Sequence, residues 1–189
     1  LSEGLGIGIE DPPFVSGVDV AGVVEATGSA VEGVAPGDRV VRCPNRTCGR
    51  CRFCREGPEN RCEQYSLDHG GLAERALARA DRLIEIPDDL GFAGAASLPV
   101  GYLTAYHMMR RTDVSQGDLV FVPGAAGSVG VAAVGLLDAI GARSVVTSTS
   151  RAKLDRLVEI GADHAIESGD PDEIRAAVEE IGAVDAVLN

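Results

Sequence analysis

The most restrictive feature of this 189-residue sequence is a glycine-rich loop set between an apolar segment and a small-residue segment. Residues 119–122 form a continuous apolar run, which is typical of a strand buried on both faces. The loop Gly124-Ala-Ala-Gly127-Ser-Val-Gly130 follows, and a helix of small and apolar residues is expected to reach about Ile140. This order predicts a strand, a tight turn and a helix that begins at the turn.

Strands and helices continue to alternate after this loop. Strands are expected at residues 144–148, 164–166 and 184–188, and helices at 151–160 and 171–181. Strands that alternate with helices and are apolar on both faces favour a parallel sheet covered on both sides. Residues 93–189 are therefore predicted to form a Rossmann-type, doubly wound sheet, preceded by two helices that meet near Pro99.

The first half of the chain, residues 1–92, has a different character. Strands are expected at 18–28, at 39–42 and within 72–86, separated by turns and by a long loop over 43–64. The fold class is therefore α/β, with a mostly-β domain over 1–92 followed by the Rossmann-type domain over 93–189. The sequence begins at Leu1 rather than Met and stops within a strand-like segment, so we expect both domains to be partial and residues 1–189 alone to be inactive.

Four of the five cysteines are clustered, as Cys48, Cys51 and Cys54, followed by Cys62 after seven residues. Zinc is bound tetrahedrally by four such thiolates, and four protein ligands leave no position for a substrate. A loop so poor in apolar residues gains its stability from the metal. The spacing predicts a structural zinc site in a lobe over residues 43–64, with the surrounding arginines favouring the thiolate forms.

Three other interpretations of this cluster are open. The first three cysteines match the start of a bacterial iron–sulfur run, but the fourth spacing differs and no proline follows Cys62. A basic zinc knuckle that binds nucleic acid would suit the arginines, but the rest of the chain is acidic. Four unligated thiols are the third, and they rarely cluster at such spacing. Zinc is therefore favoured.

The glycine loop predicts a nicotinamide dinucleotide site, because backbone N–H groups at such a helix start bind a pyrophosphate. The residues expected to contact it are Gly124, Ala125, Gly127, Ser128, Val129 and Gly130. The next strand ends without an acid that could bind the ribose 2′-hydroxyl. Ser148, Thr149 and Arg151 suit a 2′-phosphate instead, which favours NADP(H) over NAD(H). Alternatively, the loop is a turn without ligand and Arg151 begins a solvated helix face.

Short segments along nearly the whole chain resemble the medium-chain dehydrogenase/reductase family, which includes zinc alcohol dehydrogenases and quinone reductases. These segments are residues 17–28, Pro36-Gly37-Asp38-Arg39-Val40, the cysteine lobe, Gly70-Gly71-Leu72-Ala73-Glu74, Leu103-Thr104-Ala105-Tyr106 and Gly161-Ala162-Asp163-His164. The resemblance implies a GroES-like catalytic domain joined to a Rossmann domain. It also implies hydride transfer between nicotinamide and a carbonyl, an alcohol or an activated double bond, with Thr104 near the nicotinamide and Lys153 near the adenosine ribose.

The sequence departs from the family at the catalytic zinc site. Val18 stands where the family has a ligating histidine, Asp19 where it has glutamate, and Val100 where it has the later cysteine. Because valine cannot bind a metal, the resemblance favours the branch without catalytic zinc, which acts on carbonyls, quinones or enones by hydrogen bonding and proton transfer. Asp19 and Thr104 are the candidate catalytic residues.

Two alternatives are open for the activity. One is a zinc-dependent alcohol dehydrogenase with non-standard ligands, for which Asp68 and His69 are candidates; the same pair could instead act as an acid and a base. The other is a non-catalytic dinucleotide-binding protein. NADPH oxidation would separate the enzymes from the binding protein, and metal content would separate the two enzymes.

Composition limits the classes of binding partner and the cellular compartment that we expect for this protein. The net charge is −12, which disfavours nucleic-acid binding because phosphate contacts need a basic face. No apolar run approaches the roughly 20 residues of a membrane helix. A cysteine metal site favours a reducing cytoplasm. A small-molecule substrate and, by resemblance, a homo-oligomer of the full-length protein are expected.

Overall fold

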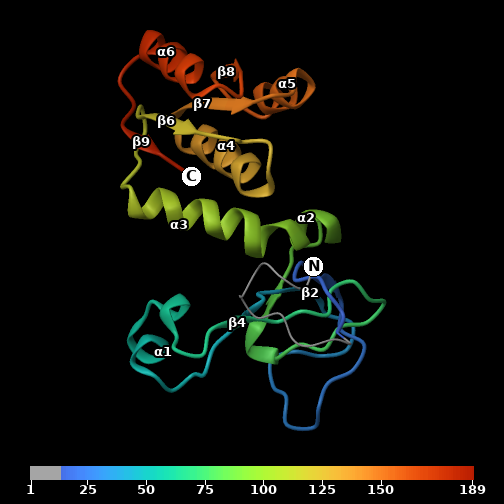
Figure 1. Cartoon of the computed structure of the whole chain (residues 1–189). Coiled ribbons are helices and arrows are strands. Elements are labelled where there is room, and N and C mark those ends of the chain that lie inside the picture. The colour runs from blue at the N-terminus through green and yellow to red at the C-terminus, as the bar shows by residue number, and fades with distance from the viewer. Residues whose placement is uncertain (1–13) are drawn as a thin grey trace. The chain divides into compact units, whose positions relative to one another are not determined.

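The computed structural model describes residues 14–189, and its contacts divide the chain into two compact units, Leu1–Pro99 and Val100–Asn189 (Figure 1). The boundary predicted from the sequence lies after residue 92. Helix α2 (Phe92–Ser97) belongs to the first unit because it packs on strands β1 and β2. Among the described residues, no helix has both the length and the apolar character needed to cross a bilayer.

The first unit is built on a small antiparallel sheet in the order β1-β2-β5. Its strands are β1 (Ala21–Val23), β2 (Arg39–Arg42) and β5 (Leu83–Glu85), the last following the 3-10 turn η2 (Ala80–Arg82). Val41, Ile86 and Ala95 form its buried core. Two of the predicted strands are shorter than expected. After Val23 the chain enters a turn, where the N–H of Gly37 bonds to the carbonyl of Val24.

A separate lobe extends from this sheet. Its base is a two-stranded antiparallel ribbon of β3 (Asn45–Arg46) and β4 (Ser66–Leu67), in which Asn45 faces Leu67. Between these strands lie helix α1 (Arg52–Glu56) and the 3-10 turn η1 (Glu59–Arg61), where the sequence analysis expected only a loop. Neither helical segment contains a buried residue. The lobe therefore lacks an apolar core of its own.

The second unit contains a four-stranded parallel sheet in the order β8-β7-β6-β9. Its elements are β6 (Leu119–Val122), α4 (Ser128–Ile140), β7 (Arg143–Ser148), α5 (Arg151–Glu159), β8 (His164–Glu167), α6 (Pro171–Ile181) and β9 (Ala186–Val187). Helices α4 and α6 lie on opposite sides of the sheet (Figure 1). The predicted Rossmann-type topology is thereby confirmed, as is the α/β fold class.

The helical segment before β6 is continuous where a break was predicted. Helix α2 passes through a π-helical turn, η3 (Leu98–Tyr102), directly into α3 (Leu103–Arg111). Pro99 lies inside this turn. Proline removes a hydrogen bond and crowds the preceding turn of an ordinary α-helix, so the wider π-helical turn admits it without ending the helix.

Candidate functional site

The four lobe cysteines converge on one point. Their sulfur atoms all lie within 4.8 Å of one another, with Cys48 and Cys54 3.8 Å apart and Cys51 and Cys54 3.5 Å apart. A tetrahedral zinc with bonds of about 2.3 Å needs sulfurs roughly 3.8 Å apart. All five cysteines of the chain are free thiols, so no disulfide competes for these sulfurs. The donor set and its dimensions fit a closed, structural zinc site.

Backbone N–H groups stabilise negative charge on these sulfurs. The N–H groups of Cys48 and Gln64 point at the sulfur of Cys62, at 3.3 Å each, and that of Cys51 at the sulfur of Cys48, at 3.4 Å. Hydrogen bonds from the backbone of Arg50 and Cys51 lower the pKa of the Cys48 thiol to about 6. The sequence analysis attributed this effect to the arginine side chains, whereas the structure attributes it to backbone N–H groups.

The sulfurs are not equivalent in the absence of metal. Desolvation, followed by the neighbouring Cys51 thiol, raises the pKa of Cys54 to about 11. A bound cation would lower the pKa of each thiol, because its positive charge stabilises every thiolate directly. Cys54, whose pKa is raised, would therefore lose its proton when a metal binds.

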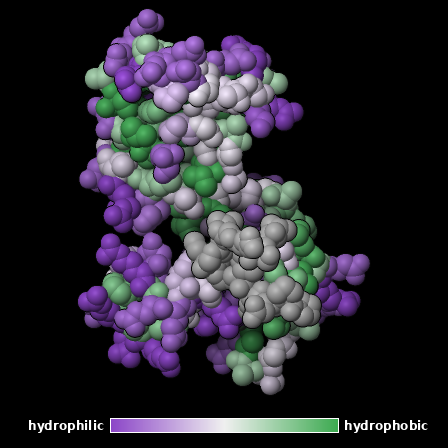
Figure 2. All heavy atoms as spheres, viewed as in Figure 1, coloured by the Kyte–Doolittle hydropathy of each residue, from purple (hydrophilic) through white to green (hydrophobic). Residues whose placement is uncertain are grey.

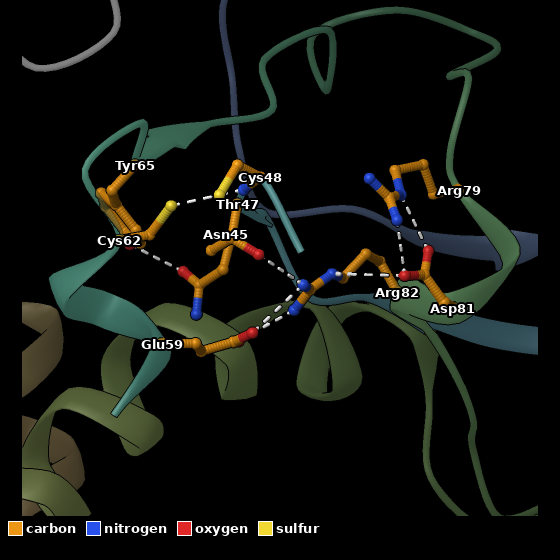
Figure 3. A network of polar contacts seen from close by, with 9 residues as sticks. All are labelled: Asn45, Thr47, Cys48, Glu59, Cys62, Tyr65, Arg79, Asp81 and Arg82. Carbon is orange, nitrogen blue, oxygen red and sulfur yellow. Dashed lines mark hydrogen bonds and ion pairs between the residues drawn. The ribbon is translucent and has the colours of Figure 1, made fainter. Parts of the chain in front are cut away.

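Arg82 anchors the lobe to the sheet of the first unit (Figure 3). Its guanidinium donates to both carboxylate oxygens of Glu59, at 2.8 and 3.1 Å, and to the Thr47 hydroxyl at 2.9 Å. Glu59 belongs to η1 and Thr47 directly precedes the first ligand. The lobe's visible face is mostly hydrophilic (Figure 2). Polar contacts, rather than apolar burial, therefore position it.

The glycine loop of the second unit is fixed by contacts with β7. The N–H of Gly124 donates to the hydroxyl of buried Thr147 at 3.0 Å, and the N–H of Ala125 to the carbonyl of the same residue at 3.2 Å. Gly124 has a φ of +59°, in the left-handed region. A Cβ added to Gly130 would lie 2.5 Å from Ala125, so only glycine permits this close approach. The turn is thus tightly specified.

An open cavity of about 270 Å³ lies over this loop and the start of α4. Five of the predicted cofactor-binding residues line it, namely Gly124, Gly127, Ser128, Val129 and Gly130. Ala125, the sixth, belongs to the same loop but is completely buried. The first N–H groups of a helix have no acceptor within the helix. The cavity therefore adjoins unpaired backbone donors, which suit a pyrophosphate.

The predicted ribose-reading residues follow the carboxyl end of β7. Ser148 is half-buried and its hydroxyl accepts the N–H of Ser150 at 3.2 Å, while Thr149 is exposed. Arg151 and Lys153 lie on α5 with exposed side chains, and the Arg151 guanidinium is paired with Asp155 at 2.9 Å. Such an exposed pair contributes at most about 1 kcal/mol, so it leaves Arg151 able to bind an anion.

The remaining predicted site residues belong to different units of the chain. Asp19 is exposed before β1 in the first unit, and Thr104 is exposed on α3 in the second. Asp68 and His69 follow β4. Within residues 14–189, the four cysteines form the only group of three or more side chains close enough to share a metal ion.

Two residues that hold neighbouring backbone groups in place, Arg42 and Thr147, were not predicted from the sequence. Arg42 is 1% exposed, and its buried guanidinium donates to the carbonyls of Asp68, His69 and Leu77. Thr147 holds the glycine loop, as described above. Thr147 follows two valines in β7, but the same strand also contains Ser144 and Ser148, so the sequence did not single it out. An arginine at the end of β2 gave no sign that it would be buried.

Comparison with known proteins finds relatives that match both units of the chain. Residues 3–88 match the alcohol dehydrogenase GroES-like domain. An alcohol dehydrogenase of Geobacillus stearothermophilus is 32% identical over 93% of this chain and 53% of its own length. An acryloyl-coenzyme A reductase of Metallosphaera sedula is also 32% identical, over 90% of this chain and 54% of its own. A crystal structure of an NAD-dependent alcohol dehydrogenase superimposes with a TM-score of 0.83 at 38% identity, covering 90% of this chain and 51% of that one.

The matches to alcohol dehydrogenases extend over both units of the chain. The predicted resemblance to the medium-chain dehydrogenase/reductase family is confirmed by these matches. It spans about half the length of the curated relatives it matches.

Proposed function

We propose that the full-length protein is an NADP(H)-dependent oxidoreductase that acts on a carbonyl, a quinone or an enone and carries one structural zinc ion. The observation that carries this proposal is the cavity over the glycine loop, which adjoins the unpaired N–H groups of α4. The nearby end of β7 offers Ser148, Thr149 and Arg151. Together they suit a pyrophosphate and a 2′-phosphate.

The chain's own residues hold and orient the cofactor, which supplies the hydride. The N–H groups of Ser128, Val129 and Gly130 would bind the pyrophosphate, while Gly130 lets the helix approach the loop closely. Thr104 is the residue proposed to lie against the nicotinamide, and Lys153 the one near the adenosine ribose. Asp19 is proposed as a catalytic residue in the first unit. The unbridged cysteines support a reducing compartment, and the cytoplasm is the compartment proposed here.

Reduction without a catalytic metal is favoured by Val18 and Val100, which cannot serve as ligands. The similarity to an acryloyl-coenzyme A reductase supports an activated double bond as the electron acceptor. The second candidate is a zinc-dependent alcohol dehydrogenase with non-standard ligands. The names of the Geobacillus relative and of the NAD-dependent structure favour it.

Zinc content and substrate choice distinguish these candidates in the full-length protein. We expect one zinc per chain by elemental analysis, together with NADPH oxidation in the presence of cyclohex-2-enone. Two zinc ions per chain and oxidation of primary alcohols would identify the alternative. No turnover with enones, quinones, aldehydes or alcohols would refute both.

Cofactor preference is tested with one pair of variants on α5. Replacing Arg151 with glutamine should weaken NADPH binding about tenfold, because a charge-assisted contact with phosphate contributes roughly 1.5 kcal/mol, and should leave NADH binding unchanged. Arg156→Gln is the matched control, since Arg156 lies near the other end of the same helix. Equal effects of Arg151→Gln on both cofactors, measured by calorimetry, would refute the 2′-phosphate assignment.

A further inference from the structure

The sulfurs of Cys51 and Cys54 lie close enough to form a bond after a small movement. They are 3.5 Å apart, closer than those of Cys48 and Cys54 at 3.8 Å. Cys51 immediately precedes α1 and Cys54 lies in its first turn, so a spacing of three residues brings the two side chains to one face. The sulfurs of a disulfide are about 2 Å apart, so a side-chain shift of about 1.5 Å joins this pair. Both cysteines are free thiols and are therefore available for such a bond.

The surroundings of this pair admit a small oxidant. Cys51 and Cys54 are half-buried, whereas Cys62 is only 6% exposed. The exposed side chains of Arg52 and Arg55 directly follow the two half-buried cysteines in the chain. Their positive charges favour the departure of a negative leaving group from the sulfur. Hydrogen peroxide is little larger than water, so it can reach half-buried sulfurs that a bulkier reagent cannot.

Distance and exposure decide which cysteines react when the lobe is loaded with zinc. Every ligand of such a site is a thiolate, so ionisation does not distinguish the four sulfurs. Both remaining criteria favour Cys51 with Cys54. Cys48 is the nearest competitor, since its sulfur lies 3.8 Å from that of Cys54, but its sulfur also accepts the N–H of Cys51. The pair separated by two residues is therefore the one expected to join.

The lobe cannot keep its structure if this pair is removed from the ligand set. A structural zinc site needs four ligands, and only Cys48 and Cys62 would remain. Helix α1 and turn η1 contain no buried residue, so no apolar core takes over from the metal. The contacts of Arg82 hold only the base of the lobe. Oxidation of two sulfurs is thereby coupled to the order of residues 43–64.

We propose that Cys51 and Cys54 are a reversible modification site, at which a peroxide joins them in a disulfide and the lobe gives up its metal. This inference rests on the structural zinc of the proposed function. One sulfur attacks the peroxide, so that an S–O bond forms, the O–O bond breaks and hydroxide leaves. The second sulfur attacks the first, so that the S–S bond forms, the S–O bond breaks and a second hydroxide leaves. The two thiolates lose two electrons and the peroxide gains them, and a dithiol reductant reverses the change.

The first test treats the full-length, zinc-loaded protein with a small excess of hydrogen peroxide. One zinc ion should be released for each disulfide formed, as measured with a chromogenic chelator, and dithiothreitol with added Zn²⁺ should restore the site. Trypsin cleaves after Arg50, Arg52 and Arg55, which places Cys51 and Cys54 on separate peptides. Mass spectrometry should therefore find these two peptides linked before reduction and separate after it.

The second test removes the partner thiol but keeps a zinc ligand. Cys54→His should bind zinc through a ring nitrogen and should retain it under the peroxide treatment that empties the wild type. Cys43→Ser, outside the ligand set, is the control and should lose zinc as the wild type does. Zinc retention by oxidised wild type, or a disulfide between any other pair, would overturn the proposal. If the purified protein contains no zinc, the zinc assignment fails and the peptide map alone decides whether Cys51 and Cys54 join; the same holds if Cys54→His binds no zinc.

Discussion

The cysteine lobe and the second unit, Val100–Asn189, are stabilised by opposite means. Helix α1 and turn η1 of the lobe contain no buried residue. The parallel sheet and its helices share one cluster of 15 buried apolar residues. Burial of apolar surface contributes roughly 25 cal/mol per Å², so the second unit has a large driving force that the lobe lacks. In the lobe, the contacts of Arg82 and the proposed zinc ligation would replace that driving force.

This difference also determines how each site is assembled. The lobe collects its four ligands from a single segment of fifteen residues, 48–62. The glycine loop instead depends on Thr147, which is 23 residues away and reaches it through the neighbouring strand. The first site therefore depends on a few atoms of the ligands themselves, whereas the second depends on the packing of a whole unit.

The sharpest test of this comparison removes one ligand. Cys62→Ser should abolish zinc binding and unfold residues 43–64, because structural zinc contributes about 10–16 kcal/mol of apparent binding free energy in small zinc domains. NADPH binding should persist, since the other unit has its own core. Elemental analysis and limited proteolysis provide the measurement. Cys43→Ser, which lies outside the ligand set, is the control, and full zinc retention in Cys62→Ser would refute the assignment.

The reciprocal test perturbs the glycine loop. Gly130→Val places a side chain where even a Cβ would lie 2.5 Å from Ala125. Such overpacking costs about 1–3 kcal/mol, and it should abolish detectable NADPH binding while zinc content remains unchanged. Gly135→Ala on the same helix is the control, because its nearest contact would be an ordinary 3.8 Å. Normal NADPH affinity in Gly130→Val, measured by calorimetry, would contradict the loop assignment.

A smaller effect is expected at the junction between the lobe and its sheet. Arg82→Met removes three hydrogen bonds from a side chain that is 15% exposed, and should cost about 1–3 kcal/mol. Arg79→Met removes only the exposed pair with Asp81 and should cost less than about 1 kcal/mol. Urea unfolding and the rate of zinc release to a chelator measure both. Equal costs would show that Arg82 does not anchor the lobe.

The smallest effect concerns the thiols of zinc-free protein. Cys48, with a pKa of about 6, is mostly thiolate at pH 7, whereas Cys54, with a pKa of about 11, is mostly thiol. Alkylation by iodoacetamide should therefore modify Cys48 first, and its rate should fall as the pH drops below 6. Peptide mass spectrometry identifies the order. Preferential modification of Cys54 would contradict the backbone hydrogen bonds at Cys48, and zinc should protect all four cysteines.

Several elements could be predicted closely because their signals are local. Helix α6 covers Pro171–Ile181 as expected, since Asp170 accepts the N–H groups of Asp172 and Glu173 and so marks its start. Strands β2 and β6 also match their predicted bounds. The strand expected within residues 72–86 is limited to Leu83–Glu85. Strand length depends on a partner strand, which a single segment does not specify.

The sequence alone determines much of the cysteine cluster and of the glycine loop, because short spacings bring their atoms close together. Four cysteines within fifteen residues, and three glycines at the junction of a strand and a helix, leave the chain few compact arrangements. Only the tertiary structure decided that Arg42 is buried, that Arg82 joins the lobe to the sheet and that His69 keeps both nitrogens unpaired. These properties depend on residues that lie up to 35 positions apart. Such pairs meet only when the whole domain folds.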